Sequence, residues 1–62
     1  MLSTYEFDIY AYQMADSPSS MVAMFAVYSA GSEHAARRMA ITHLHRSGFF
    51  AYAITLTRGE KQ

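Results

Sequence analysis

The sequence predicts a small α+β domain, in which one helix covers one face of a three-stranded, mainly antiparallel sheet. Residues 4–13 alternate apolar and polar side chains, which is the period of a strand. Residues 33–46 are rich in good helix formers, and the apolar runs at residues 21–29 and 49–57 fit two further strands. We therefore expect the order strand, strand, helix, strand, in one domain that spans residues 1–62.

The first two strands are expected to form an antiparallel hairpin. Tyr5, Phe7 and Ile9 share one face of the first strand. Asp, Ser and Pro residues then cluster at positions 15–20, which indicates a turn. The second strand follows this turn directly, so the two strands can pair.

The helix is expected to begin after Ser32 and to end before Gly48. The Ser32 hydroxyl can accept a hydrogen bond from a free backbone N–H of the first turn, and Glu33 suits the positive end of the helix dipole. Glycine readily adopts the left-handed conformation that ends a helix. Ala36 and Ala40 lie on the apolar face of the helix, so it can approach a sheet closely.

The third strand is expected at residues 49–57, with residues 58–62 as a frayed tail. Because the helix must run back along the sheet, a right-handed connection favours the strand order 2-1-3, with the first strand in the centre. The order 1-2-3 with a parallel pair stays an alternative. The helix then covers a core of Tyr5, Phe7, Ile9, Phe25, Val27, Tyr52, Ile54 and Leu56.

The other face of the sheet is expected to be an apolar interaction surface. Residues 21–28 are apolar at every position, so this strand is apolar even on the face that the helix leaves uncovered. Such a patch on a small protein usually marks an interaction site, and Tyr and Met are enriched at interfaces. The expected partner interface comprises Tyr10, Tyr12, Val22, Met24, Ala26, Tyr28, Ala51 and Ala53.

Length and composition favour a protein partner. A chain of 62 residues buries only about 60% of the surface that its unfolded form exposes. Proteins this small usually add disulfides, a metal or a partner subunit, and the absence of cysteine excludes disulfides and thiolate metal sites. We therefore expect a homodimer, or a complex with another protein, joined face to face or through an edge strand.

Binding of single-stranded nucleic acid is the alternative function. Tyrosines on an open sheet can stack on bases, and arginines can contact phosphates. The net charge of zero argues against it, as does the position of the arginines on the helix, across the sheet from the tyrosines. The residues of this alternative site are Tyr10, Tyr12, Tyr28, Arg37, Arg38 and Arg46.

The sequence points to no catalytic site, metal site, cofactor or small-molecule substrate, so we do not expect an enzyme. His43 and His45 lie two residues apart, which on a helix turns their side chains about 160° from each other. Neither a Gly-x-Ser-x-Gly motif nor a glycine-rich phosphate loop is present. Glu6 and Asp8 could act as an acid–base pair only in a cleft, for which this sheet offers little depth.

We expect a cytoplasmic protein. The apolar runs are far too short to span a bilayer, and the first ten residues carry Glu6 and Asp8 rather than the basic start of a secretory leader. The absence of cysteine is compatible with a reducing compartment. In general character the chain is similar to the small accessory proteins encoded by phages and plasmids. This resemblance implies a protein that binds and modulates a host protein.

Overall fold

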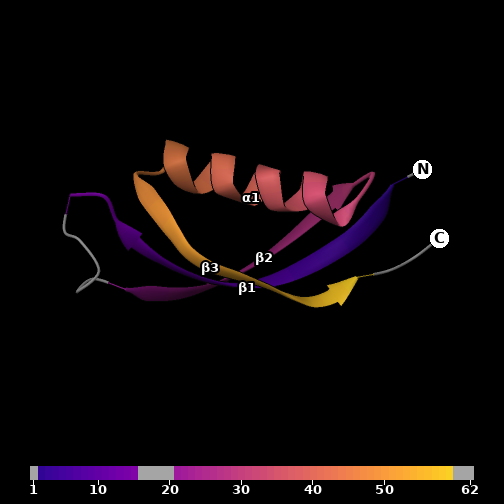
Figure 1. The fold of residues 1–62 in the computed structure, drawn as a ribbon, viewed down its shortest axis with the longest axis horizontal. Helices are drawn as coiled ribbons and strands as arrows, with labels where there is room; N and C mark the ends of the chain where they lie inside the picture. The colour runs from indigo at the N-terminus through magenta and orange to yellow at the C-terminus, as the bar shows by residue number, and fades with distance from the viewer. Residues whose placement is uncertain (1, 16–20, 60–62) are drawn as a thin grey trace.

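The elements follow one another along the chain in the predicted order of strand, strand, helix and strand (Figure 1). The structure, a computed structural model, describes residues 2–15 and 21–59. Its elements are β1 (Ser3–Gln13), β2 (Val22–Ala30), α1 (Glu33–Arg46) and β3 (Phe49–Gly59). The strand order is β2-β1-β3, and β1 pairs antiparallel with both neighbours. The predicted fold class and strand order are therefore confirmed, and the alternative order 1-2-3 is wrong.

The third strand is longer than predicted. Arg58 lies opposite Glu6 and Gly59 lies opposite Tyr5, so both belong to β3 rather than to a frayed tail. Residues 60–62 of that predicted tail lie outside the described residues, as do positions 16–20 of the predicted turn.

Local signals in the sequence set both ends of α1. The Ser32 hydroxyl accepts a hydrogen bond of 3.1 Å from the backbone N–H of Ala35, which satisfies a donor that has no partner within the helix. At the other end Gly48 has a φ of 85°, a left-handed conformation that costs glycine little. Its N–H donates to the carbonyl of His45 over 3.0 Å. The helix therefore spans residues 33–46, as predicted. No helix within the described segments is long and apolar enough to cross a membrane.

The core lies between α1 and the central strand. Ala36 and Ala40 of the helix are completely buried, and their small side chains let the helix backbone lie close to the sheet. Phe7 is the largest fully buried side chain. The buried core residues are Phe7, Ile9, Ala11, Ala30, Ala36, Ala40 and Leu44.

The faces of β2 are the reverse of those predicted. Residues directly opposite each other in an antiparallel pair project to the same side of the sheet. Ala26 lies opposite Phe7, and Met24 lies opposite Ile9. This half of β2 therefore faces α1, and Met24, Ala26 and Tyr28 pack against the core. Val22 lies opposite the buried Ala11 and belongs to the same side.

The predicted core positions of β2 face solvent instead. Phe25 is 60% exposed and Val27 is 50% exposed. They lie opposite Asp8 and Glu6, on the side of the sheet away from the helix. Their assignment to the core is therefore wrong.

An irregularity in β3 corrects two further assignments. Tyr10 lies opposite Ala53 and Ala11 lies opposite Ala51, so Tyr52 is an extra residue without a partner in β1, as in a β-bulge. Tyr52 is 69% exposed rather than part of the core. Ala51 packs against the core rather than lying on the uncovered face. Ala53 keeps its predicted face, because it shares it with Tyr10.

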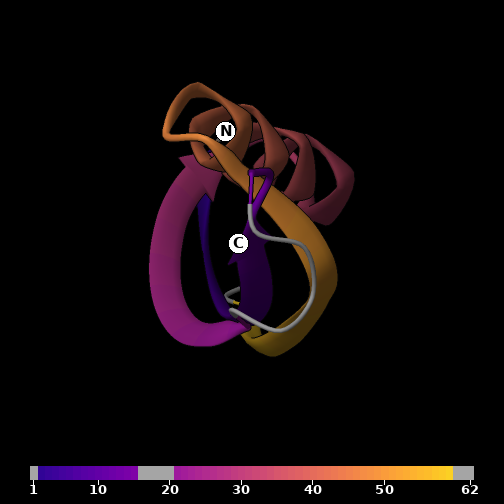
Figure 2. The ribbon, with the colours of Figure 1, turned by 90° about the vertical axis from the view of Figure 1, so that its left-hand side faces the viewer.

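The sheet is strongly twisted and bends toward the helix. A second irregularity in β3 lies opposite the step from Glu6 to Phe7, and bulges increase the local twist of a strand. β1 rises toward α1 at both of its ends (Figure 1), and the end view shows β2 and β3 curving away on either side of it (Figure 2). One face of the sheet therefore holds the helix, and among residues 2–15 and 21–59 no element covers the other face.

Candidate interaction surfaces

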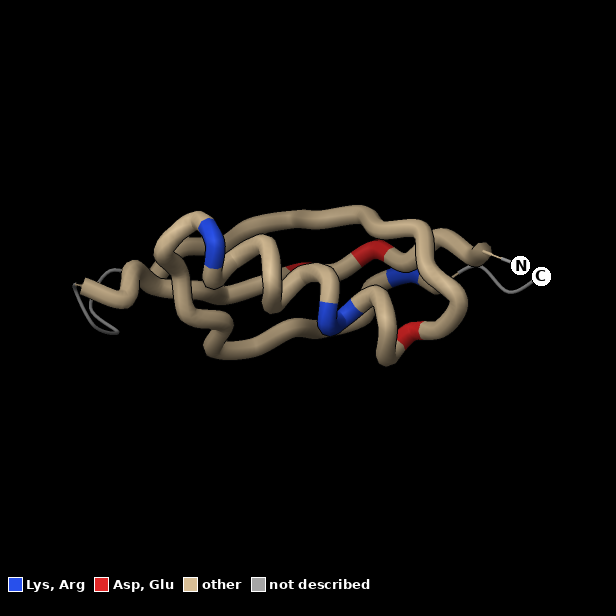
Figure 3. The backbone as a smooth tube through the Cα atoms, turned by 90° about the horizontal axis from the view of Figure 1, so that it is seen from above, with Lys and Arg blue, Asp and Glu red and all other residues tan. Residues whose placement is uncertain are grey.

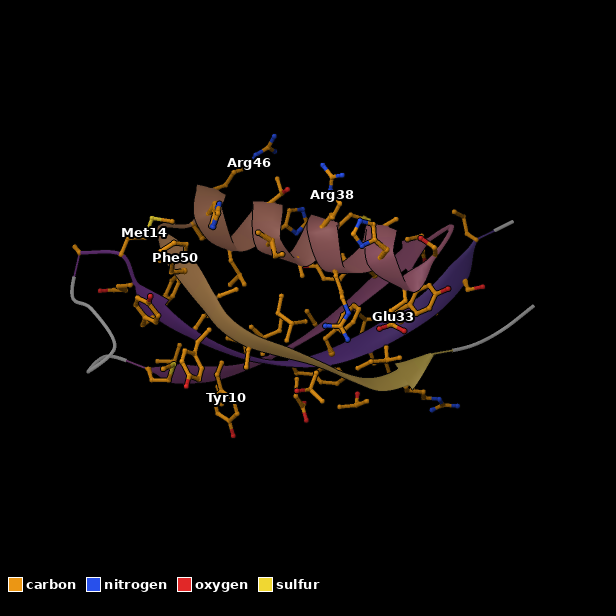
Figure 4. All side chains as sticks on the ribbon, in the orientation of Figure 1. Tyr10, Met14, Glu33, Arg38, Arg46 and Phe50 are labelled. Carbon is orange, nitrogen blue, oxygen red and sulfur yellow. The ribbon has the colours of Figure 1, made fainter. Side chains whose placement is uncertain are left out.

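The uncovered surface of the sheet, which we call the open face, carries the largest exposed apolar side chains near the centre of the sheet. Tyr10 is 53% exposed and projects away from α1 (Figure 4). From the pairing of the strands, the open face includes Glu6, Asp8, Tyr10, Tyr12, Ala23, Phe25, Val27, Ser29, Ala53, Thr55 and Arg58. Apolar side chains therefore occupy its β2 side and its middle.

Charge on the open face is sparse and is confined to one part of it. Glu6 and Asp8 are its acidic residues, and Arg58 lies directly opposite Glu6 on β3. Seen from the helix side, the charged positions are spread along the molecule and do not form an area of one sign (Figure 3). Such a surface suits apolar contact with a protein better than attraction to a polyanion.

Aromatic rings cluster where β3 begins. The ring of Phe50 packs edge-on against Tyr12, with centroids 5.8 Å apart. His45, at the end of α1, packs against the other side of this cluster, 5.5 Å from Phe50. The backbone N–H of Met14 donates to the carbonyl of Gly48 over 3.0 Å, which joins the end of β1 to the end of the helix. Tyr12 is therefore half-buried by its neighbours rather than presented freely to a partner.

Only part of the predicted interface lies on the open face. Tyr10, Tyr12 and Ala53 project to that side as predicted, whereas the structure places five other members on the side of the helix. Those five are Val22, Met24, Ala26, Tyr28 and Ala51. The residues that the sequence reasoning missed are Phe25, Val27 and Ala23. Ser29 is the one polar residue within β2, and it shares the side of Phe25 and Val27. It was the signal that could have identified the exposed side.

A groove runs between α1 and β2 on the helix side of the sheet. It has a volume of about 230 Å³ and is lined mainly by apolar side chains, among them Met24, Leu44 and Phe49. The Tyr28 hydroxyl lies 3.2 Å from Nδ1 of His43 and forms the polar part of the groove. Burial raises the pKa of Tyr28 above its ordinary value, so this hydroxyl keeps its proton at neutral pH.

Arg37 is engaged within the fold. Its guanidinium donates to the carbonyl oxygen of Ile54 over 2.6 Å and forms an ion pair of 2.9 Å with Glu33, one helical turn away. It also lies over the ring of Phe7, 5.3 Å from the centroid. This arginine therefore fastens α1 to the outer strand β3, and its charge is already satisfied.

The other residues of the alternative nucleic-acid site do not share one surface. Arg38 and Arg46 project from the outer side of α1, whereas Tyr10 projects from the opposite side of the sheet (Figure 4). The two arginines line a shallow cavity of about 220 Å³ together with Thr42 and His43. Tyr28 lies on the helix side, where its hydroxyl is hydrogen-bonded to His43. A single strand could not contact the sheet tyrosines and these arginines along one straight path.

Within residues 2–15 and 21–59, no group of three or more His, Asp or Glu side chains is placed to hold a metal ion. Comparison with models of known protein families, with curated proteins and with solved structures found no match for the chain. Its function must therefore be inferred from its own surfaces.

Proposed function

We propose that this protein is a small non-enzymatic protein–protein interaction module that forms a homodimer. The observation that supports the proposal most strongly is the exposure of Phe25 and Val27, which are 60% and 50% exposed on the β2 side of the open face. Large aromatic side chains held on a rigid sheet are the kind of residue that dominates the energy of protein interfaces. Phe25 and Val27 belong to the same strand, so they would enter an interface together.

The physical gain from covering these residues is substantial for a chain of this size. Fully burying an exposed side chain of this kind is worth about 1.5–3 kcal/mol, and Phe25 and Val27, which are already about half buried, would each contribute about half of that. In a symmetric dimer each contact residue counts twice, because the same surface is used by both copies. This gain offsets the loss of translational and rotational freedom on association.

A modulating role toward another protein is a further part of the proposal. It is supported by the general similarity of the chain to small phage and plasmid accessory proteins. We also propose a cytoplasmic location, since a chain without cysteine needs no oxidising compartment to fold.

Replacing Phe25 with glutamate tests the proposal. We expect Phe25→Glu to weaken self-association at least about tenfold, because each new carboxylate would lose water on entering an apolar contact. The matched control is Tyr52→Glu, which places the same charge at an exposed position of the opposite edge strand. Sedimentation velocity of the three proteins would measure association, with circular dichroism to verify that each is folded.

Two results would overturn the placement of the dimer contact on the exposed side of β2. A folded Phe25→Glu protein that associates as tightly as the unaltered chain would show that the exposed side of β2 is not the contact. Equal weakening in Tyr52→Glu would show that added negative charge alone is responsible. Ala26, by contrast, is unsuited to this test, because its side chain faces α1.

Nucleic-acid binding makes a different prediction. It requires affinity for a single-stranded oligonucleotide that falls steeply with added salt and is lost in Tyr10→Ala. We expect no such binding, because the arginines lie across the molecule from Tyr10. Tight, salt-sensitive binding would replace the present proposal with this alternative.

A further inference from the structure

The two outer strands of the sheet differ in how well they are protected from pairing with another strand. The register of β3 shifts at two places, and bulges disrupt the regular spacing of backbone donors and acceptors that an added strand needs. The Arg37 guanidinium also donates a hydrogen bond to the carbonyl oxygen of Ile54, and Arg58 places a charge near the end of the strand. These are the features by which natural sheets discourage edge-to-edge pairing.

β2 has none of these features. It pairs with β1 over nine consecutive positions without a register shift. Its sequence, VAMFAVYSA, contains no proline and no charged residue. Among the described residues, no side chain caps a backbone group of β2 in the way that Arg37 caps Ile54. Alternate N–H and C=O groups along the outer edge of such a strand are available to another strand.

Building on the proposed self-association, we propose that the outer edge of β2 is its site, where β2 pairs antiparallel with β2 of a second copy. A two-fold axis perpendicular to the sheet then passes beside Ala26, because only this register pairs all nine residues of the strand. The two three-stranded sheets join into one sheet of six strands. Both helices lie on the same side of it, since this axis does not exchange the faces.

The side chains of β2 are complementary to their own copy in this register. Phe25 lies opposite Val27 of the second copy on the open face, and aromatic with β-branched is a favourable cross-strand pair. On the helix side Met24 lies opposite Tyr28 of the second copy, next to the apolar groove beside α1. No like charges meet across the junction, because the strand carries none. The β2 strand of a second copy can therefore pair with this edge without any rearrangement of the monomer.

Replacing Ala26 with cysteine tests this register directly. Directly opposed residues of an antiparallel pair have Cα atoms about 4.5–5.5 Å apart, which is within the range of a disulfide. The chain has no cysteine of its own, so any covalent dimer must come from the introduced thiol. We expect most of the Ala26→Cys protein to become a covalent dimer under mild oxidation by oxidised glutathione, seen on a non-reducing gel.

Ala23→Cys and Ala53→Cys are the controls. In the proposed dimer position 23 lies opposite position 29 of the second copy, so the two introduced thiols at 23 are about 20 Å apart and stay reduced. Both Ala23 and Ala53 lie on the open face. A dimer stacked through that face would leave Ala26→Cys reduced, because its thiol faces α1, and would cross-link a control variant where the two-fold axis passes close to it.

The outcomes separate this inference from the proposed function. Cross-linking of a control but not of Ala26→Cys, with the unaltered protein dimeric, would overturn the edge pairing while the homodimer stands. A monomeric unaltered protein would overturn both. If Ala26→Cys does not fold, the exchange rates of the backbone amides of β2 in the unaltered dimer distinguish edge pairing from other contacts. Edge pairing predicts protection at consecutive amides of β2, and fast exchange at every second one would contradict it.

Discussion

Phe7→Ala is expected to lower the free energy of unfolding by about 4 kcal/mol. Phe7 is 0% exposed, at the centre of the middle strand, between Ala26 of β2 and Leu56 of β3. Truncation removes its buried ring and leaves a cavity that the fixed sheet cannot close. A domain of 62 residues has a total stability of roughly 3–9 kcal/mol. The expected loss is therefore close to half of the total stability at the upper end of this range and exceeds it at the lower end.

Urea denaturation followed by circular dichroism would measure this effect. Several protein concentrations are needed, because the proposed self-association would add to the apparent stability. Tyr52→Ala is the control, since it removes a side chain of similar size that is mostly exposed. A Phe7→Ala protein that unfolds at the same urea concentration as Tyr52→Ala would contradict the placement of the core.

Arg37→Ala is expected to lower the free energy of unfolding by roughly 2 kcal/mol. The substitution removes the charged hydrogen bond to the Ile54 carbonyl, the contact with the Phe7 ring and the ion pair with Glu33. The hydrogen bond should dominate, because it joins the helix to β3 and its loss leaves a backbone acceptor without that partner. The ion pair lies within one helix and is partly exposed, so it contributes little.

Arg38→Ala is the matched control for Arg37→Ala. The two arginines are neighbours in α1, so both changes alter the helix propensity equally. Arg38 projects from the outer side of the helix and is exposed (Figure 4), so its loss should change stability by less than about 0.5 kcal/mol. Equal urea midpoints for the two variants would show that Arg37 does not fasten α1 to β3.

The helix could be predicted to the residue because its signals are local. Ser32 begins the helix by accepting a hydrogen bond from a residue three positions away, and Gly48 ends it through its own backbone conformation. Both effects can therefore be predicted from the residue types alone. The strand order also followed from the sequence, since a short helical connection leaves few ways to return to the sheet. The ends of the helix therefore do not depend on contacts between distant residues.

The faces of β2 could not be read in the same way. From Val22 to Tyr28 this strand is apolar at every position, so the period of two does not show which side is buried there, and Ser29 is the one polar signal in the strand. Its register is fixed by long-range pairing with β1, where Ala26 meets Phe7. A shift by one residue exchanges the two faces, which is why the prediction placed Phe25 and Met24 on the wrong faces of the sheet.

The error in β3 has a different cause. Tyr52 is one extra residue relative to β1, so the alternation that holds from Ala53 onward does not continue to Ala51. Nothing in this alanine- and aromatic-rich stretch signals a bulge in advance. Both errors carried over to the candidate site, in which only Tyr10, Tyr12 and Ala53 were placed on the correct side of the sheet.

Sedimentation equilibrium of the unaltered protein, over a wide range of concentration, tests the central claim most directly. Self-association through β2 predicts a mass that rises to twice the 7.0 kDa of one chain and then stays constant. A limit at two copies is expected because β3, the other edge, is protected from further pairing. A folded protein that sediments as a single chain at every concentration would contradict the claim.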